Sequence, residues 1–491
     1  MNTAGAIDYT DGSLPGPNEE VLEAQARVCT GPHQARPLGT GEDDPQPQRT
    51  IALILASLRG QLPWDDRVSP AQMGAFLAAM TIRRGFVAAT NWSDAEHAAF
   101  EASAPALRRE LPEELAFLLQ PDRGCKAVTS EEEPVIGALT QVLRGEHLSY
   151  GDTLNACAAI LKLQVRPSLA AALLIGQRMN LETYDELRGH LDAMRVSAEV
   201  VPLSVAELTH IGQPYDGNRR YLHPGVFAAA VRAALGHPSI LHGVEEMAPK
   251  RGTTQEQILT ALGAATDLTL SRAGQLIEDA NIGFAYVSQR EYAPQAYRLH
   301  DLRAHIAKRP TWATVEKVQQ LFSCEAANHM IVGYYHAGYE QRLLQLMWDR
   351  GFDSGIVIKG EEGTCNYSLR SPSPSTNDRK AINYTGGFRR SSGERVDFTV
   401  DVDPLPLGFH YDQNPRPQES GASHWADAGR RALAGESGPV HDRIILNAAM
   451  PLVWTGVVGD AASAITAARG AVASGRALQH LERYIGASQQ R

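Results

Sequence analysis

The sequence predicts an α/β protein with a small all-helical N-terminal domain and a larger α/β domain, in which helices flank a mostly parallel central sheet. Within residues 49–200, apolar residues recur at helical spacing. After residue 200, short apolar runs alternate with amphipathic helices, which is typical of a parallel sheet covered on both faces. A chain of 491 residues with 43% hydrophobic residues is long enough to bury both cores.

The composition divides the chain into three segments. Residues 1–48 are rich in Gly, Pro, Asp and Gln, so we expect an extended or partly disordered arm, within which 19–28 have the pattern of one short helix. The helical domain spans 49–200. Leu-Arg-Gly recurs there at 58–60 and 143–145, which suggests a degenerate internal repeat. The α/β domain spans 201–491.

Short apolar runs mark the strands of the α/β domain. They predict buried strands at 239–241, 283–287, 329–334 and 355–358, with helices at 225–235, 254–263, 271–278, 296–307 and 340–350. The polar segment 371–395 is expected to be a long exposed loop, and 396–402 alternates like a strand. Residues 442–484 are expected to hold two Ala-rich helices.

Charge and cysteine usage exclude several classes of protein. The formal net charge of -10 argues against a nucleic-acid backbone as the main partner. The five cysteines are scattered without a Cys-x-x-Cys pair, which favours free thiols in a reducing cytoplasm over disulfides or a structural zinc site. No run of about 18 apolar residues and no secretory signal is visible, so we expect a cytoplasmic protein without a membrane partner.

Two glycine-bearing turns, at 212–217 and 241–254, flank a β-α-β pattern and form the strongest candidate site. Glycine lets backbone N–H groups approach phosphate oxygens, and lysine and threonine add side-chain donors. Asp216 lies in the first turn and His242 in the second. The predicted phosphate- or pyrophosphate-binding residues are Gly212, Gly217, Gly243, Lys250, Gly252, Thr253 and Thr254.

Each of these residues also has a purely structural interpretation. Gly, Pro and Asp are ordinary turn residues, and Asp216 could cap the following helix. His242 at a strand end could be a structural histidine, and Lys250 could belong to a solvated loop. Glu361 and Glu362 follow the strand predicted at 355–358, where a carboxylate pair suits Mg²⁺. The alternative there is a charged turn.

Several segments, in order, resemble anthranilate phosphoribosyltransferase and its relatives. The helical run 143–153 resembles that family's N-terminal domain. The turn 212–217 reads Gly-Gln-Pro-Tyr-Asp-Gly where the family has Gly-Thr-Gly-Gly-Asp-Gly, and 241–243 reads Leu-His-Gly for Lys-His-Gly. Residues 438–449 resemble a C-terminal helix of the family. The resemblance covers roughly residues 135–485 and rests on the ordered set rather than on one motif.

The resemblance implies a glycosyltransferase of the pentosyltransferase kind, which binds phosphoribosyl pyrophosphate (PRPP) with Mg²⁺ and forms a homodimer through its helical domain. It implies catalytic roles for Asp216, His242 and Arg303. Arg303 corresponds to the arginine that holds the carboxylate of the aromatic acceptor. Glu361 and Glu362 would hold the metal in place of the family's Asp-Glu pair, whose positions are taken here by Cys365 and Asn366.

Further departures separate the chain from the tryptophan-pathway enzyme. Residues 222–225 read Leu-His-Pro-Gly where the family places Asn-Ile-Ser-Thr on the pyrophosphate. We therefore predict a phosphoribosyltransferase for an aromatic or heteroaromatic acceptor other than anthranilate. One alternative is a catalytically inactive binding protein on the same scaffold, which would recognise nucleic acid or a protein partner. Another is an enzyme resembling nucleoside phosphorylase.

Overall fold

The computed structural model describes residues 14–42, 44–195, 200–372 and 380–490. Contacts divide the chain into two compact units, which are described separately. A helical unit comprises Met1–Val196 and Pro294–Val315, and an α/β unit comprises Ser197–Ala293 and Glu316–Arg491. The segment Pro294–Val315 thus belongs to the helical unit, although it was expected within the α/β domain. None of the helices in the described ranges is long and apolar enough to cross a membrane.

The helical unit packs around α3, which is buried along almost its whole length. Ser69 and Gln72 form a capping box at the start of α3, and Ser93 and Glu96 form one at the start of α4. The helices are α1 (Glu19–Val28), α2 (Pro47–Leu58), α3 (Pro70–Arg83), α4 (Asp94–Glu110), α5 (Glu113–Leu119), α6 (Glu132–Val142), α7 (Tyr150–Leu161), α8 (Pro167–Asn180), α9 (Tyr184–Arg195), α14 (Pro294–Tyr297), α15 (His300–Ala304) and α16 (Trp312–Val315).

The segment expected to be an extended arm is partly folded into this unit. Residues 19–28 form α1, whose Val21 and Val28 side chains are fully buried. Asn18 caps the helix, and its backbone N–H donates to Gln72 Oε1 at 3.0 Å. Burial of an apolar helix face against α3 explains why residues 19–28 form a helix within this Pro- and Gly-rich segment.

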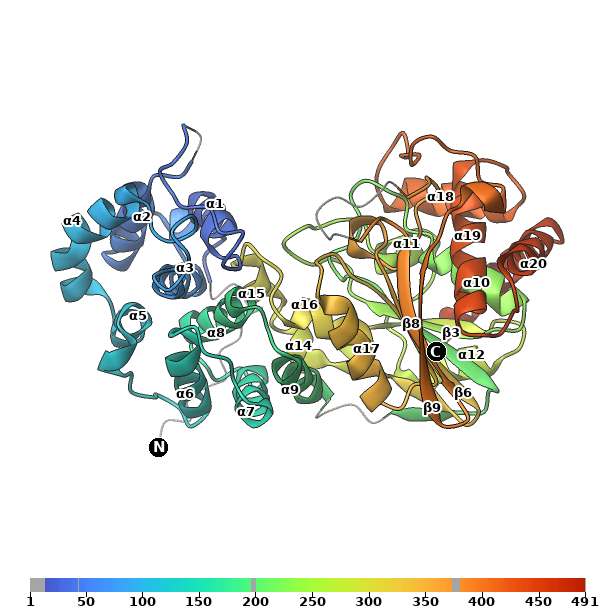
Figure 1. Ribbon diagram of the computed structural model, residues 1–491, viewed down its shortest axis with the longest axis horizontal. Helices are drawn as coiled ribbons and strands as arrows, with labels where there is room; N and C mark the ends of the chain where they lie inside the picture. The colour runs from blue at the N-terminus through green and yellow to red at the C-terminus, as the bar shows by residue number, and fades with distance from the viewer. Residues whose placement is uncertain (1–13, 43, 196–199, 373–379, 491) are drawn as a thin grey trace. The chain divides into compact units, whose positions relative to one another are not determined.

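The α/β unit is built on a seven-stranded sheet with the order β4-β3-β2-β6-β7-β8-β9. The first five strands in this order are parallel, and β8 and β9 are antiparallel. Helices α10, α19 and α20 lie together on one side of the sheet and α17 on the other (Figure 1). The strands are β2 (Glu207–Gly212), β3 (Ser239–Gly243), β4 (Phe284–Ser288), β6 (Ala327–Gly333), β7 (Ser354–Ile358), β8 (Tyr384–Ser391) and β9 (Glu394–Asp401); β1 (Val201–Leu203) pairs separately with β5 (Phe322–Cys324).

Nine α-helices accompany these strands within the described residues of the α/β unit. They are α10 (Gly225–Ala234), α11 (Gln255–Ala261), α12 (Leu270–Glu278), α13 (Gln289–Tyr292), α17 (Tyr339–Asp349), α18 (Ala422–Leu433), α19 (Pro439–Trp454), α20 (Ala461–Ala473) and α21 (Arg476–Ser488). The predicted fold class is confirmed: helices flank a mostly parallel sheet, and a separate unit is all-helical.

The structure differs from the sequence prediction at several places in the α/β unit. Strand β2 was not expected, although it is an interior strand that pairs with β3 and β6. Part of the expected loop 371–395 forms β8, because its Gly- and Arg-rich sequence pairs antiparallel to β7. The C-terminal tail holds three helices, since Gly475 in a left-handed conformation separates α20 from α21.

Candidate functional site

The two glycine turns lie side by side at one edge of the sheet. Strands β2 and β3 are parallel neighbours, so the loops that follow Gly212 and Gly243 emerge at the same edge. The backbone N–H of Gly252 donates to Asp216 O at 2.8 Å. Asn218 and Thr253 exchange two backbone hydrogen bonds of 2.9 and 2.7 Å. The turns that the sequence singled out are therefore tied to each other.

Close packing within the chain accounts for two of the predicted phosphate-binding glycines. Gly217 has φ +66°, and a Cβ there would lie 2.4 Å from the carbonyl oxygen of Gly252. A Cβ on Gly212 would lie 1.9 Å from the carbonyl oxygen of Lys317. Both positions thus require glycine for the folding of the loops, before any ligand is considered.

Lys250 joins the two turns to the loop after β7. Its Nζ lies 3.8 Å from an Asp216 carboxylate oxygen and 3.6 Å from one of Glu362. The Asp216 and Glu362 carboxylates are almost wholly buried. The fold therefore brings three of the predicted site residues, from three separate loops, around one ammonium group.

A row of backbone N–H groups holds the Glu362 carboxylate. The N–H groups of Arg219, Arg220 and Tyr221 donate to its two oxygens at 3.1, 2.9 and 3.2 Å. Burial opposes ionisation, but these donors and Lys250 outweigh it and keep the pKa of Glu362 below its usual value. Consecutive N–H groups that converge on one carboxylate form an anion-binding nest. The sequence did not indicate this nest, because it is made of main-chain atoms.

Glu361 turns away from Glu362. It forms a buried ion pair with Arg443 on α19 and accepts a hydrogen bond from Asn414. Burial raises the pKa of Glu361 to about 7, although the charge of Arg443 lowers it. The two glutamates predicted to share a metal therefore have different partners. Within the described ranges no group of three or more His, Cys, Asp or Glu side chains is placed to hold a metal ion.

The pair Cys365–Asn366 belongs to a neutral hydrogen-bond network. Gln213 donates to Asn366 Oδ1 and to Cys365 Sγ, both at 2.9 Å, and accepts from the Cys365 backbone N–H at 3.1 Å. Burial raises the pKa of the Cys365 thiol to about 12, so it carries no charge at neutral pH. These residues do not suit Mg²⁺, which prefers carboxylate oxygens. Asp216 and Glu362, which already converge on one cation, suit it better.

His242 lies in a buried aromatic cluster. Its Nδ1 is 2.6 Å from the hydroxyl of Tyr215, which also bonds the hydroxyl of Tyr292. Burial lowers the pKa of His242 to about 3, and nearby His210 contributes to this lowering, so the ring is neutral. Nε2 is buried and has no hydrogen-bond partner within the described parts of the chain. Tyr215 stands at the fourth position of the first turn, where a glycine was expected from the resemblance, and the sequence analysis did not select it.

The remaining candidates have local roles or lie elsewhere. Thr254 caps α11 in a capping box and donates to Glu245 O at 3.0 Å. A Cβ on Gly243 would lie 3.2 Å from the Tyr286 hydroxyl. Arg303 lies buried on α15 of the helical unit, whereas the other candidate residues belong to the α/β unit. The role of Arg303 stays a prediction.

A helical domain combined with a mostly parallel sheet and ligand loops at its carboxyl edge defines a class of glycosyltransferase fold. Residues 136–198 match the glycosyl transferase family, helical bundle domain. Among curated proteins, the chain is 24% identical to anthranilate phosphoribosyltransferase of Chromobacterium violaceum over 72% of this chain and 97% of the relative. It is 27% identical to the Thermomicrobium roseum protein of the same name, over 71% and 96%.

Solved structures show the same fold. Anthranilate phosphoribosyltransferase of Saccharomyces cerevisiae, in complex with PRPP and Mg, matches with a TM-score of 0.60 and 15% identity over 73% of this chain and 99% of that one. The enzyme of Thermus thermophilus matches with a TM-score of 0.56 and 21% identity, over 73% and 99%. The predicted resemblance is confirmed: the chain is a divergent protein similar to anthranilate phosphoribosyltransferases. These relatives belong to the predicted enzyme class, and the yeast complex holds the predicted co-substrate and metal.

Proposed function

We propose that this protein is a PRPP-dependent phosphoribosyltransferase acting on an aromatic or heteroaromatic acceptor other than anthranilate, outside the tryptophan pathway. The observation that carries the proposal is the cluster of Lys250, Asp216 and Glu362 beside the nest at 219–221. It combines a cation, two carboxylates and an anion-binding nest at the edge of the sheet where ligands of such folds bind. The curated relatives support the transfer of a phosphoribosyl group.

Phosphoribosyl transfer needs little covalent chemistry from a protein. The ribose passes through an oxocarbenium-like state while diphosphate leaves, so catalysis consists of positioning and of neutralising the charge of the leaving group. Lys250 and the N–H groups of 219–221 are the donors that we expect diphosphate to take, since they already bind a carboxylate here. Asp216 and Glu362 would hold Mg²⁺, which would neutralise part of the diphosphate charge.

The aromatic cluster around His242 is the candidate acceptor region. A neutral imidazole with a pKa of about 3 is too weak a base to take up a proton at neutral pH, so we infer that it positions the acceptor through Nε2. Tyr215 adds a bulky ring where the resemblance expects glycine, which supports an acceptor of different shape from anthranilate. Arg303 would orient an acidic acceptor.

The predictions on partners and location complete the proposal. We propose a homodimer formed through the helical unit, without a nucleic-acid partner. The five cysteines are all free thiols, which supports the predicted cytoplasmic location.

Calorimetric titration with PRPP, in the presence and absence of Mg²⁺, tests the proposal. Binding that strengthens with Mg²⁺, followed by diphosphate release with one member of a panel of aromatic acceptors, is the expected result. The absence of heat at millimolar PRPP would contradict it. Activity with anthranilate alone would contradict the narrower statement about the acceptor.

Replacing Lys250 with methionine is expected to weaken PRPP binding by about tenfold or more, because a charge-assisted contact to phosphate is lost. Arg251→Met is the matched control. Arg251 is the neighbouring cation, but it is half-exposed and pairs with Glu246. Calorimetry of the two variants beside the wild type checks the prediction. Equal PRPP affinities for both variants would refute a phosphate-binding role of Lys250.

One observation favours the alternative of an inactive binding protein. Cys365 and Asn366, which form a neutral network with Gln213, occupy the positions where the resemblance expects the metal-binding acids. If this alternative holds, PRPP binding should be absent or independent of Mg²⁺, and no acceptor should release diphosphate. Phosphorolysis of a nucleoside by inorganic phosphate would instead identify the phosphorylase-like alternative.

A further inference from the structure

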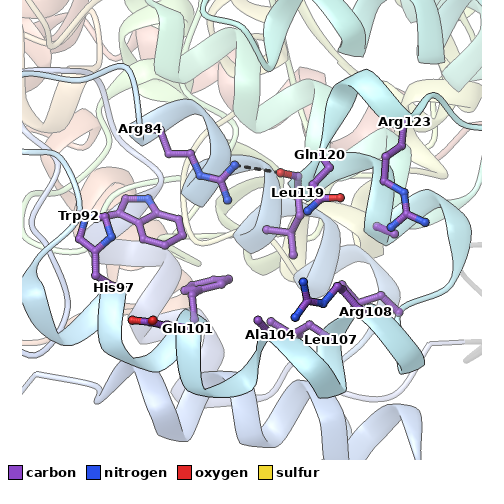
Figure 2. A pocket seen from close by; sticks show the side chains of 13 residues that line it. Arg84, Trp92, His97, Glu101, Ala104, Leu107, Arg108, Leu119, Gln120 and Arg123 are labelled. Atoms are coloured by element: carbon purple, nitrogen blue, oxygen red, sulfur yellow. Dashed lines mark hydrogen bonds between the residues drawn. The ribbon is translucent and has the colours of Figure 1, made fainter.

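The helical unit contains a cavity of about 330 Å³ outside the candidate site described above. It lies between α4 and α5, next to the loop that follows α3 (Figure 2). All of its lining residues fall between 84 and 123, ahead of residues 136–198, which match the glycosyl transferase family. The cavity therefore belongs to a part of the chain for which the proposed transfer reaction gives no role.

One face of α4 forms a wall of this cavity. Its residues 97, 100, 101, 104, 107 and 108 follow the three- and four-residue spacing of one helix face. Such a face is normally covered by another helix, as α2 covers α4 elsewhere. Here the face instead lines an open space of the size of a small-molecule site.

One part of the inner surface of the cavity is apolar and aromatic. Phe100, Leu107 and Leu119 contribute buried side chains. Trp92 packs against Phe100 with ring centroids 4.5 Å apart. The indole N–H of Trp92 already donates to Met80 O at 2.7 Å, so the ring offers the cavity its apolar surface. This surface suits the hydrophobic body of a ligand rather than an inorganic ion.

Three arginines and a single glutamate line the same cavity. Arg84 stacks over Trp92 at 5.0 Å from the ring centroid and donates to Leu119 O at 3.0 Å. In Figure 2 the guanidinium groups of Arg84 and Arg108 extend toward the middle of the cavity from opposite sides. Arg108 and Arg123 make no ion pair or side-chain hydrogen bond within the described ranges.

The lining of the cavity carries a local excess of positive charge, with three arginines and one glutamate. The protein carries a formal net charge of -10. The neighbouring Arg109, which does not line the cavity, pairs with Glu110. Guanidinium groups bind carboxylates, sulfonates and phosphates through two parallel hydrogen bonds. Two such guanidinium groups beside an apolar wall are therefore complementary to a ligand with an anionic head and an apolar body.

We propose that this cavity is a binding site for a small amphipathic organic anion, whose aromatic or aliphatic body packs against Trp92 and Phe100 while its acidic group meets Arg108 and Arg123. The site is separate from the PRPP site and independent of the transfer reaction. Glu101, the one acid in the lining, weakens binding of the anion by repulsion.

The probe for the test is 8-anilinonaphthalene-1-sulfonate, an aromatic sulfonate whose fluorescence rises in apolar surroundings, titrated into the full-length protein. Its neutral analogue N-phenyl-1-naphthylamine reports the contribution of the charge. Arg108→Gln is expected to weaken binding of the sulfonate by about tenfold. The matched control Arg109→Gln removes the same charge one residue away and is expected to change binding by less than about twofold.

A second pair of variants tests the apolar wall. Ala104→Phe fills the cavity and is expected to abolish binding, whereas Ala102→Phe, at a position of the same helix that does not line the cavity, leaves it unchanged. Circular dichroism confirms that each variant is folded, and Glu101→Gln is expected to tighten binding. The proposal is overturned if the sulfonate shows no saturable binding, if the two arginine variants behave alike, if Ala104→Phe binds normally, or if PRPP displaces the probe.

Discussion

Replacement of Arg443 by methionine is expected to destabilise the α/β unit, with a pH-dependent part of about 1–2 kcal/mol near pH 8. Arg443 and Glu361 form an ion pair in which both side chains are almost completely buried. Arg443 also donates to Asn414 Oδ1 at 3.0 Å and to Pro415 O at 3.1 Å. Removal of the cation would leave a buried carboxylate without its counter-charge, which costs more than the ion pair itself contributes.

The destabilisation is expected to depend on pH. Burial raises the pKa of Glu361 from 4.5 to about 7, so its protonated form favours the folded state. This contribution to stability is fully present below pH 4.5, the pKa of Glu361 in the unfolded chain. It is lost as the pH rises through about 7, the pKa of Glu361 in the folded protein. Arg443 lowers the pKa of Glu361 in the folded protein, so in its absence that pKa is higher. The stability lost on raising the pH is then larger in the variant than in the wild type. The difference between variant and wild type should thus be smallest near pH 4.5 and should increase above pH 7.

Urea unfolding of both proteins across this pH range measures the effect. Arg430→Met is the matched control, because Arg430 forms an exposed ion pair with Glu482 on the surface of the same unit. Surface pairs contribute about 0–1 kcal/mol, and this variant should show no strong pH dependence. A pH-independent loss in Arg443→Met, or a loss no larger than that of Arg430→Met, would contradict the proposed role of the buried pair.

Replacement of Gly212 by alanine is expected to destabilise the α/β unit by about 2–3 kcal/mol. Gly212 ends β2, and a Cβ at this position would lie 1.9 Å from Lys317 O and 2.9 Å from a methyl group of Val332. Lys317 cannot move away easily, because its Nζ donates to Gly333 O at 2.6 Å. Strand β2 would therefore have to shift against its neighbours.

Thermal unfolding followed by circular dichroism measures this loss. Gly470→Ala is the control, since Gly470 lies in α20 with open space around the position of a Cβ. That variant should gain stability by up to about 1 kcal/mol, because alanine favours the helix. If Gly212→Ala keeps wild-type stability but loses PRPP binding, Gly212 serves the ligand rather than the packing of the loops.

Periodic patterns in the sequence were sufficient to predict most of the fold. The strands expected at 239–241 and 283–287 correspond to β3 and β4. A short continuous apolar run between turn residues is typical of a buried strand in a large domain. Strand β8 could not be predicted in this way. It contains Gly386 and Gly387 and two arginines, and it is a strand because β7 and β9 pair with it on either side.

The candidate site was predicted in part. The turn chemistry singled out Asp216 and Lys250, and the structure places them within one cluster. Glu361 and Glu362 were treated as a pair because they are adjacent in the sequence. Their side chains diverge because Glu362 has φ +54° and binds the nest, whereas Glu361 is buried with Arg443.

The sequence by itself determined the two-part architecture, the glycine turns and the resemblance to phosphoribosyltransferases, because these depend on local spacing and on ordered motifs. Only the tertiary structure decided what each turn residue contacts. It showed that a carboxylate of the chain occupies the nest at 219–221, that Tyr215 bonds His242, and that an arginine-lined cavity lies beside α4. The physical reason is that backbone donors and contacts between distant loops leave no periodic signal in the sequence.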